Sequence, residues 1–381
     1  MSELLDKMIG WRHELHRNPE LSLHEYDTAA FIARELRSMG IEVTEGVGGT
    51  SLVGTLKVGD GPRSIGLRAE LDAIPLDEQN DLPYRSVNPG AMHACGHDGH
   101  MAMLLGAAKM LSESRDFNGT VHFIFQHDEE TLHGALDMLD AGLLESFPMD
   151  EIYGAHNMPF VPEGKIAMKV GGIMASEDNF TITIRGEGGH AAQPHKAKDA
   201  IVIAAEIILA IQTIVSRNID PARSSVISLT EISSDGVHNV IPGTVTIKGD
   251  TRSLDPVSQK TVENRLREIC EGICKMNGAQ CDFEFTYEDI PTVNDPVCMS
   301  YAAEAAAKVV GKENVDTAVV APLTSEDFAR FLTVMPGCFV FIGSGRTDND
   351  PALHSAKYDF NDNILETGAG FFAQLVRDRL K

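Results

Sequence analysis

Residues 95–100 read Cys-Gly-His-Asp-Gly-His, and they lie between a stretch typical of a β-strand and one typical of a helix. Cys95 and His97 stand two residues apart, so a thiolate and an imidazole can bind one cation. Further ligand types follow downstream, after strand-like runs or near the C-terminus: Glu129, Glu130, His156 and His354. A lone pair of this kind usually means a small buried thiol and surface imidazoles. Several candidates at strand ends instead favour a metal-dependent hydrolase.

Strands and helices alternate on both sides of this segment. A helical period of apolar residues stops at Pro19, and a second helix is expected over residues 27–39 with Gly40 as its C-cap. The turn formed by residues 59–62 is expected to join two strands. The expected elements are strands over residues 52–58, 64–68, 120–126 and 152–155 and a helix over residues 99–112. This order predicts an α/β sheet covered by helices.

The pattern changes near Gly171. Phe180, Ile182 and Ile184 alternate with polar residues, which predicts a strand with one exposed face. The next elements have the β-α-β-β-α-β order of a ferredoxin-like domain. Their expected ranges are helices over residues 197–215 and 257–275 and strands over 226–229, 245–250 and 282–287. After Pro291 the α/β pattern resumes, with helices over 298–310 and 364–379 and a strand over 338–342.

The chain is therefore expected to have the α/β fold class with two domains. A large catalytic domain, with a mixed sheet covered by helices, comprises residues 1–174 and 290–381. A smaller ferredoxin-like α+β domain, residues 175–289, interrupts it. The length of 381 residues agrees with this division, since one core rarely extends so far.

Charge excludes some partners. The 32 Lys and Arg against 56 Asp and Glu give a net charge of −24, which repels nucleic-acid phosphates and anionic lipid. No stretch approaches the roughly 18 apolar residues of a membrane span, and the first residues lack the features of a secretion signal. We therefore expect a cytoplasmic protein with no nucleic-acid or membrane partner.

The six cysteines do not form a disulfide framework in a chain of this length. Cys270, Cys274 and Cys281 stand close together in sequence, but their spacing lacks the C-x-x-C form of structural zinc sites. Core thiols are the favoured interpretation of this trio, with a metal site as the alternative.

Eight short segments span nearly the whole chain: RAELDAIP from Arg68, MHACGHD from Met92, EE from Glu129, HN from His156, GHAA from Gly189, HNVIP from His238, SEDF from Ser325 and LHS from Leu353. In this order they resemble the M20 family of metallo-amidohydrolases. The resemblance is to the branch that contains hippurate hydrolases, N-acyl-amino-acid amidohydrolases and plant indole-3-acetyl-amino-acid hydrolases.

The resemblance implies a centre of two divalent metal ions, with Zn or Mn preferred and Co or Ni as alternatives. Its implied ligands are Cys95, His97, Glu130, His156 and His354. Two such ions can share a water and polarise a scissile carbonyl. Glu129 is then the general base, although a pair of glutamates alone would usually be a solvated loop. Asp72 and Asp98 are candidates to orient ligands through hydrogen bonds.

The resemblance also gives the smaller domain the roles of a lid and a dimerisation domain. His190 then helps to hold the oxyanion, in dimers that of the neighbouring subunit, and Asn239 joins it at the substrate. Arg252 is the candidate to bind a substrate carboxylate, with His195 and Arg185 as alternative contacts. A homodimer, or an oligomer built from dimers, is expected.

Some positions depart from the family pattern. Gln126-His127-Asp128 stands where relatives have Gln-Pro-Ala, and Thr131-Leu132-His133-Gly134 replaces a Gly-rich run. Glu70 stands where relatives usually have Asp. These changes leave the implied ligands intact, but they make ordinary hippurate-like specificity doubtful. His127 or His133 is a candidate contact for an unusual acyl or amine group.

The expected function is hydrolysis of the amide bond of an N-acyl amino acid, giving a carboxylate and a free amino acid, by a metal-activated water. A dipeptidase or carboxypeptidase, or an aminohydrolase acting on an aromatic amine, is the alternative with the same metal centre. A noncatalytic binding module is a third hypothesis. Retention of Glu129 together with the five implied ligands argues against that third hypothesis.

Overall fold

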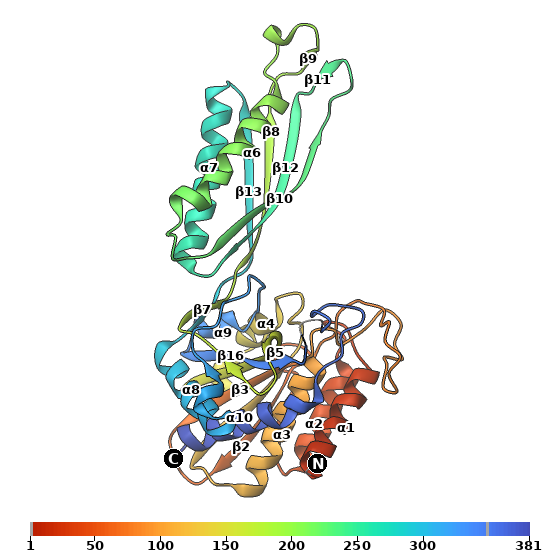
Figure 1. Ribbon diagram of the computed structural model, residues 1–381, viewed down its shortest axis with the longest axis vertical. Helices are drawn as coiled ribbons and strands as arrows, with labels where there is room; N and C mark the ends of the chain where they lie inside the picture. The colour runs from red at the N-terminus through yellow and green to blue at the C-terminus, as the bar shows by residue number, and fades with distance from the viewer. Residues whose placement is uncertain (1–2, 348–349) are drawn as a thin grey trace. The chain divides into compact units, whose positions relative to one another are not determined.

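The computed structural model describes residues 3–347 and 350–381 (Figure 1). The chain divides into two compact units. The large unit contains residues 1–171, 294–320 and 327–381, and the small unit contains residues 172–293 and 321–326. The segment 321–326 thus belongs to the small unit, although it lies between two segments of the large unit. The sequence pattern does not indicate this.

The large unit is built on an eight-stranded mixed sheet with the order β1-β2-β4-β3-β5-β16-β6-β15. Its strands are β1 (Glu42–Glu45), β2 (Leu52–Val58), β3 (Ser64–Glu70), β4 (Gly119–Gln126), β5 (Glu151–Pro162), β6 (Ile166–Ala167), β15 (Val315–Asp316) and β16 (Gly337–Gly345). The central strands β4, β3, β5 and β16 run parallel to one another. They are buried on both faces, which explains their nearly continuous apolar runs.

The turn at residues 59–62 joins two strands, as expected, but they are not neighbours in the sheet, because β4 lies between them, antiparallel to β2 and parallel to β3. One expectation about this sheet is wrong. The strand expected over residues 152–155 continues as β5 to Pro162, so His156 lies inside a strand rather than after one. Local turn signals do not reveal that a distant strand inserts between two neighbours.

Helices cover the sheet of the large unit. They are α1 (Glu3–Arg17), α2 (Tyr26–Ser38), α3 (His97–Ser114), α4 (Gly134–Asp140), α5 (Leu143–Ser146), α8 (Pro296–Val310), α9 (Ala329–Leu332) and α10 (Leu365–Arg379). α3 is apolar around nearly its whole circumference, because it lies between α1, α2 and α10 (Figure 1). Gly40 has a φ of 75° directly after α2, as expected of a C-terminal glycine.

The small unit has a four-stranded antiparallel sheet with the order β10-β12-β8-β13. Its main elements are β8 (Glu177–Arg185), α6 (Ala200–Asn218), β10 (Ser225–Ser234), β12 (Thr244–Ser253), α7 (Pro256–Met276) and β13 (Gln280–Asp289). α6 and α7 lie side by side on one face of this sheet (Figure 1). The order and connections are those of the expected ferredoxin-like fold.

Short elements complete the chain: β7 (Gly171–Met174), β9 (Gly189–His190), β11 (Val240–Ile241), β14 (Thr292–Asn294), and 3₁₀ turns at Pro194–Lys196, Lys312–Asn314 and Asp362–Ile364. In the small unit, Cys270 and Cys274 are buried in the apolar core and Cys281 packs against it. Their sulfurs do not form a compact three-donor group, so this trio belongs to the core, as expected.

α6 corrects one statement made from the sequence. With 19 residues, it is long and apolar enough to cross a membrane by length and composition, although no stretch was expected to approach that limit. Ile203, Ile207, Ile211 and Ile214 nevertheless face the core of the small unit. A core helix passes the same test of length and composition, and packing accounts for this buried face, whereas Ile201, Val202 and Leu209 of α6 are exposed.

Candidate metal centre

The candidate ligands of the large unit gather where its parallel strands end. Asp72 follows β3, residues 127–133 follow β4, and His156 lies in the second half of β5. The carboxyl ends of parallel strands share one edge of a sheet, which is where binding sites of α/β folds form. α3 begins beside this edge with His97 in its first turn.

Three donors form a buried group around Cys95. The Sγ of Cys95 lies 3.4 Å from the Nε2 of His156. Cys95, His97 and His156 each present one ligand atom, and these atoms lie within 4.8 Å of one another. A group of this size, composed of a thiol and two imidazoles, matches the ligand types of zinc and related ions.

A second group of three donors shares the same thiol. The Nε2 of His354 lies 3.3 Å from the Sγ of Cys95 and 3.6 Å from a carboxylate oxygen of Glu130. Cys95, Glu130 and His354 also have ligand atoms within 4.8 Å of one another. Both groups contain Cys95, so its thiolate would contribute negative charge toward two cations and would offset part of their mutual repulsion.

The histidine tautomers fit metal binding. The Nδ1 of His97 lies 2.9 Å from the carbonyl oxygen of Asp72, and the Nδ1 of His156 lies 2.7 Å from that of Asn157. Each ring therefore donates its proton through Nδ1, and Nε2 is left to bind a metal. The Nε2 of His97 is buried without a hydrogen-bond partner among the described residues. A cation at this position would satisfy it.

The electrostatics of the site also favour cations. Burial by itself lowers the pKa of His97, but hydrogen bonding to Asp72 and the nearby carboxylates of Glu70 and Glu130 outweigh it and raise the pKa to about 10. The surrounding carboxylates thus favour a positive charge at the Nε2 of His97, which a bound cation would supply in place of a proton. Burial lowers the pKa of His156, which keeps this imidazole neutral and able to bind metal.

Glu129 lies beside the donors. One of its carboxylate oxygens is 3.7 Å from the Nε2 of His97, and 6% of the residue is exposed. The preceding residue, Asp128, has a φ of 52°, and the candidate ligand His354 has a φ of 63°. Such backbone strain in residues other than glycine concentrates at functional sites, where surrounding contacts compensate for it.

The two aspartates expected to orient ligands have different surroundings. Asp72 accepts hydrogen bonds from the backbone N–H of Glu130 at 2.9 Å and from the hydroxyl of Ser22 at 2.8 Å, and its Oδ1 is 3.3 Å from the Nδ1 of His97. It therefore touches two candidate ligands. Asp98 instead contacts His16 of α1 at 2.8 Å, so it links α3 to α1.

The structure also reveals a buried polar network that the sequence pattern does not assign. The ring of His100, one turn after His97 in α3, lies 2.7 Å from a carboxylate oxygen of Glu70 and 2.6 Å from the side-chain oxygen of Asn157. Arg68 pairs with Glu70 and, at 2.7 Å, with Asp327. Two features of the sequence could have indicated this network. His100 follows His97 at an i, i+3 spacing, and Arg68 and Glu70 are charged residues at the end of an apolar strand.

In the small unit, His190 and Asn239 belong to one ribbon. His190 lies in β9 and pairs with Val240 of β11, and the N–H of Ala191 donates to the carbonyl oxygen of Asn239. Both side chains are exposed. The alternative contacts His195 and Arg185 are also exposed, and Arg185 pairs with Asp282 at 2.7 Å.

Arg252 of β12 is held by two carboxylates. Its guanidinium lies 2.7 Å from Glu177 and 3.0 Å from Asp250, and Ser325 lies 3.4 Å from it. Hydrogen bonds and ion pairs with these carboxylates raise its pKa further, although burial by itself would lower it. A substrate carboxylate at Arg252 would therefore compete with two partners already present.

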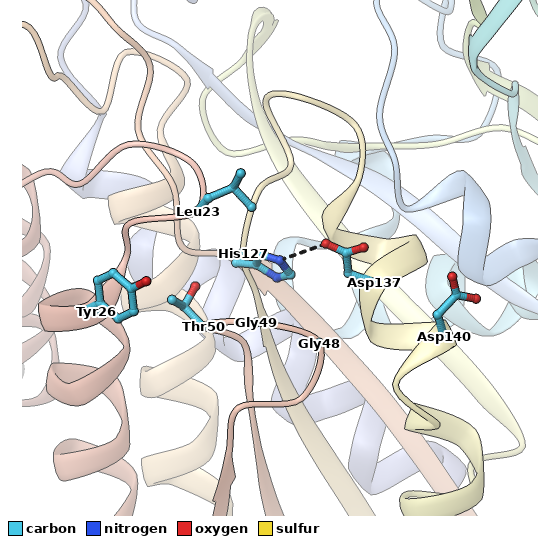
Figure 2. A pocket seen from close by; sticks show the side chains of 8 residues that line it. All are labelled: Leu23, Tyr26, Gly48, Gly49, Thr50, His127, Asp137 and Asp140. Atoms are coloured by element: carbon cyan, nitrogen blue, oxygen red, sulfur yellow. Dashed lines mark ion pairs between the residues drawn. The ribbon is translucent and has the colours of Figure 1, made fainter.

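Of the residues that depart from the family pattern, His127 lies beside a cavity of about 540 Å³ (Figure 2). His127 is buried in its wall, with Nδ1 2.6 Å from the hydroxyl of Ser51 and Nε2 3.4 Å from Asp137. The remaining lining residues are Leu23, Tyr26, Gly48, Gly49, Thr50 and Asp140. The ring of His133 contacts the carbonyl oxygen of Thr131 at 2.5 Å. Both imidazoles thus have partners within the chain.

Comparisons with known proteins agree with this fold and site. The model of the peptidase family M20/M25/M40 matches residues 66–378, so the chain belongs to this family. It is 40% identical to hippurate hydrolase from Campylobacter jejuni, covering 97% of this chain and 96% of that protein. It is 37% identical to thermostable carboxypeptidase 2 from Saccharolobus solfataricus, covering 97% and 94%.

A solved structure of a dinuclear metal-binding peptidase of the M20 family from Bacillus subtilis is similar over the whole chain. Its TM-score is 0.87 at 33% identity, covering 99% of this chain and 98% of that one. The fold, the donor groups and these relatives together identify the chain as a metal-dependent amidohydrolase.

Proposed function

We propose that this amidohydrolase cleaves the amide bond of N-acyl amino acids, releasing a carboxylate and a free amino acid. The observation that carries the proposal is the pair of three-donor groups that share Cys95, with Glu129 beside them. The similarity to a hippurate hydrolase, 40% identical over nearly the whole chain, supports this substrate class.

The donor set fits two divalent ions. Cys95, His97 and His156 would hold one ion, and Cys95, Glu130 and His354 would hold the other. A thiolate with imidazoles favours Zn or Mn over Mg, and Co or Ni are alternatives. When bound, the ions would polarise the scissile carbonyl and lower the pKa of the attacking water.

Glu129 is the proposed general base. Its carboxylate lies beside His97 and outside the two donor groups that contain Cys95, a position suited to proton transfer with a water at the centre. Glu129 would accept a proton from the attacking water and deliver it to the nitrogen of the leaving amine. The products are then a carboxylate and a free amino group, which balances the hydrolysis of one amide by one water.

The small unit supplies the proposed substrate contacts. His190 would donate to the oxyanion, and Asn239, on the same ribbon, would bind the substrate nearby. Arg252 would bind the α-carboxylate of the amino-acid portion of the substrate. That carboxylate would either displace Glu177 and Asp250 from the guanidinium or bind beside them. Substrate binding at Arg252 would require these ion pairs to rearrange.

Replacing Glu129 by Gln tests the chemistry. The change keeps the shape of the side chain and removes its basic oxygen, so kcat for an N-acyl amino acid should fall by about 10²- to 10⁴-fold. KM and metal content should stay close to wild type. Glu113→Gln, the same chemical change at an exposed glutamate of α3, serves as the control. Near-normal turnover of Glu129→Gln with metals bound would exclude Glu129 as the base.

A carboxypeptidase or dipeptidase activity is the second candidate. The similarity to a thermostable carboxypeptidase, 37% identical over nearly the whole chain, supports this second activity. A panel of N-benzoyl and N-acetyl amino acids, matched with dipeptides that carry the same C-terminal residue, separates the two functions. We expect a higher kcat/KM for the acyl amino acids, and a preference for the dipeptides would overturn the first proposal.

We also propose a homodimer that forms through the small unit, in a cytoplasmic protein. Strand β10 is an edge of its sheet, and Val202 and Leu209 expose apolar surface along α6. An open strand edge beside an apolar helix face is suited to a second copy. Sedimentation should give the mass of a dimer, and Leu209→Glu should shift it toward a monomer. A monomeric wild-type protein at micromolar concentration would refute the proposal.

A further inference from the structure

Glu25 occupies an unusual position for a buried carboxylate. It is the residue directly before α2, where a polar side chain commonly accepts a hydrogen bond from the first turn of the helix. Its side chain makes no such bond and is fully buried. The carboxylate therefore serves a purpose other than capping α2.

Three donors converge on this carboxylate. One oxygen accepts from the backbone N–H of Leu23 at 2.9 Å and from that of Asp128 at 3.0 Å. The other oxygen accepts from the hydroxyl of Thr50 at 2.7 Å. Leu23 and Thr50 also line the cavity of Figure 2, so this carboxylate joins the cavity wall to the loop after β4.

Burying a carboxylate is costly unless it is well hydrogen-bonded. Burial raises the pKa of Glu25, although the three donors oppose that shift. Among the described residues no cationic side chain forms an ion pair with it. Hydrogen bonds to a charged acceptor are the strong ones, so the bonds to Glu25 define the positions of their donors firmly.

The bond to Asp128 acts on the residue that precedes Glu129. Asp128 has left-handed backbone geometry, and the N–H of Glu130 is held by Asp72 at 2.9 Å. Two N–H groups that flank Glu129 in the chain are thus each bound by a buried carboxylate. They constrain the backbone from which the side chain of Glu129 projects toward His97.

We propose that Glu25 is a positioning residue for Glu129. By accepting the N–H of Asp128, Glu25 maintains the strained turn and fixes the direction of the base. It does so without touching the metal ligands or the substrate. The proposal rests on the proposed function, in which Glu129 carries the proton.

The test compares Glu25→Ala with a matched control. Glu20→Ala removes a carboxylate from the same connecting segment, where it accepts from the N–H groups of Asp27 and Thr28. We expect Glu25→Ala to lower kcat by about 10- to 100-fold, since a small displacement of a catalytic group has effects of this size. KM and metal content should remain close to wild type. Glu20→Ala should keep its kcat.

Glu25→Gln provides the conservative rescue. Its side-chain oxygen can still accept both N–H groups, and its amide can donate to the hydroxyl of Thr50. We expect this variant to recover most of the lost kcat, which a loss of folding stability alone would not predict. If Glu25→Ala does not fold, Glu25→Asp replaces it, because the shorter carboxylate cannot reach all three donors. The same selective fall in kcat is then expected.

Two results would overturn the inference. The first is a kcat for Glu25→Ala, or for its Asp replacement, that is no lower than that of Glu20→Ala. The second is a loss of activity that excess metal restores, since the defect would then lie in metal binding. Glu129→Gln is measured alongside: if that variant stays active, the assignment of the base fails, whatever Glu25 does.

Discussion

Raising the pH should destabilise the large unit through His16. This histidine of α1 is fully buried, with Nδ1 2.8 Å from Asp98 and Nε2 3.2 Å from Glu78. Burial by itself lowers the pKa of His16, but the hydrogen bonds to Asp98 and Glu78 outweigh it and raise the pKa to about 9, against 6.5 in an unfolded chain. The charged ring therefore stabilises the folded state.

The sign and size of the effect follow from linkage. Because the folded pKa is the higher one, the contribution of His16 is complete below about pH 6.5 and is lost as the pH rises through about 9. At about 1.4 kcal/mol for each pKa unit, the shift corresponds to about 3 kcal/mol. Wild type and His16→Gln should differ in the pH dependence of unfolding by up to this amount.

The assay is chemical denaturation at pH 6 and at pH 10, at one fixed metal concentration. The free energy of unfolding of the wild type should fall more between these values than that of His16→Gln, which carries no titrating ring. Other groups titrate in both proteins, so their contributions cancel in the difference. A difference between the two proteins that is independent of pH would refute the reasoning, because the pKa of His16 would then be the same in the folded and unfolded states.

Two further changes test the metal centre and the small unit. Asp72→Ala removes the acceptor for the N–H of Glu130, and metal affinity, measured by competition with a chelator, should fall about 10- to 100-fold; unchanged affinity would leave Asp72 without this role. Arg252→Ala should raise KM for substrates that carry a carboxylate and leave KM for their amides unchanged. If wild type and Arg252→Ala have the same KM for the carboxylate substrates, the functional partners of Arg252 are Glu177 and Asp250.

Much of the fold could be predicted because the apolar periods are strong. The alternation at Phe180, Ile182 and Ile184 correctly indicated a half-exposed strand, since β8 buries these three side chains. The order in which the strands pair in the sheet was harder to predict from the sequence. The turn at residues 59–62 has the composition of a hairpin, yet β4 separates its two strands, because sheet order depends on contacts between distant segments.

The candidate site could be predicted only in part, because local sequence patterns do not contain contacts between distant segments. Cys95 and His97 are neighbours in sequence, so their spacing is informative, and the resemblance to a family added His354 from the far end of the chain. Glu25 gave no signal, because a Glu before a helix is ordinarily a solvated or capping residue. Its importance depends on the approach of Asp128, about a hundred residues away, which no local pattern contains.

The most direct test of the central claim is the metal content of variants at Cys95. Elemental analysis of the wild type, after saturation with Zn or Mn and removal of excess metal, should give two ions per chain. Cys95→Ala should lose at least one ion and nearly all hydrolysis of N-acyl amino acids, because both donor groups contain this thiol. Cys298→Ala, which removes another buried thiol, should keep both ions. Two ions retained in Cys95→Ala would contradict a centre bridged by its thiolate.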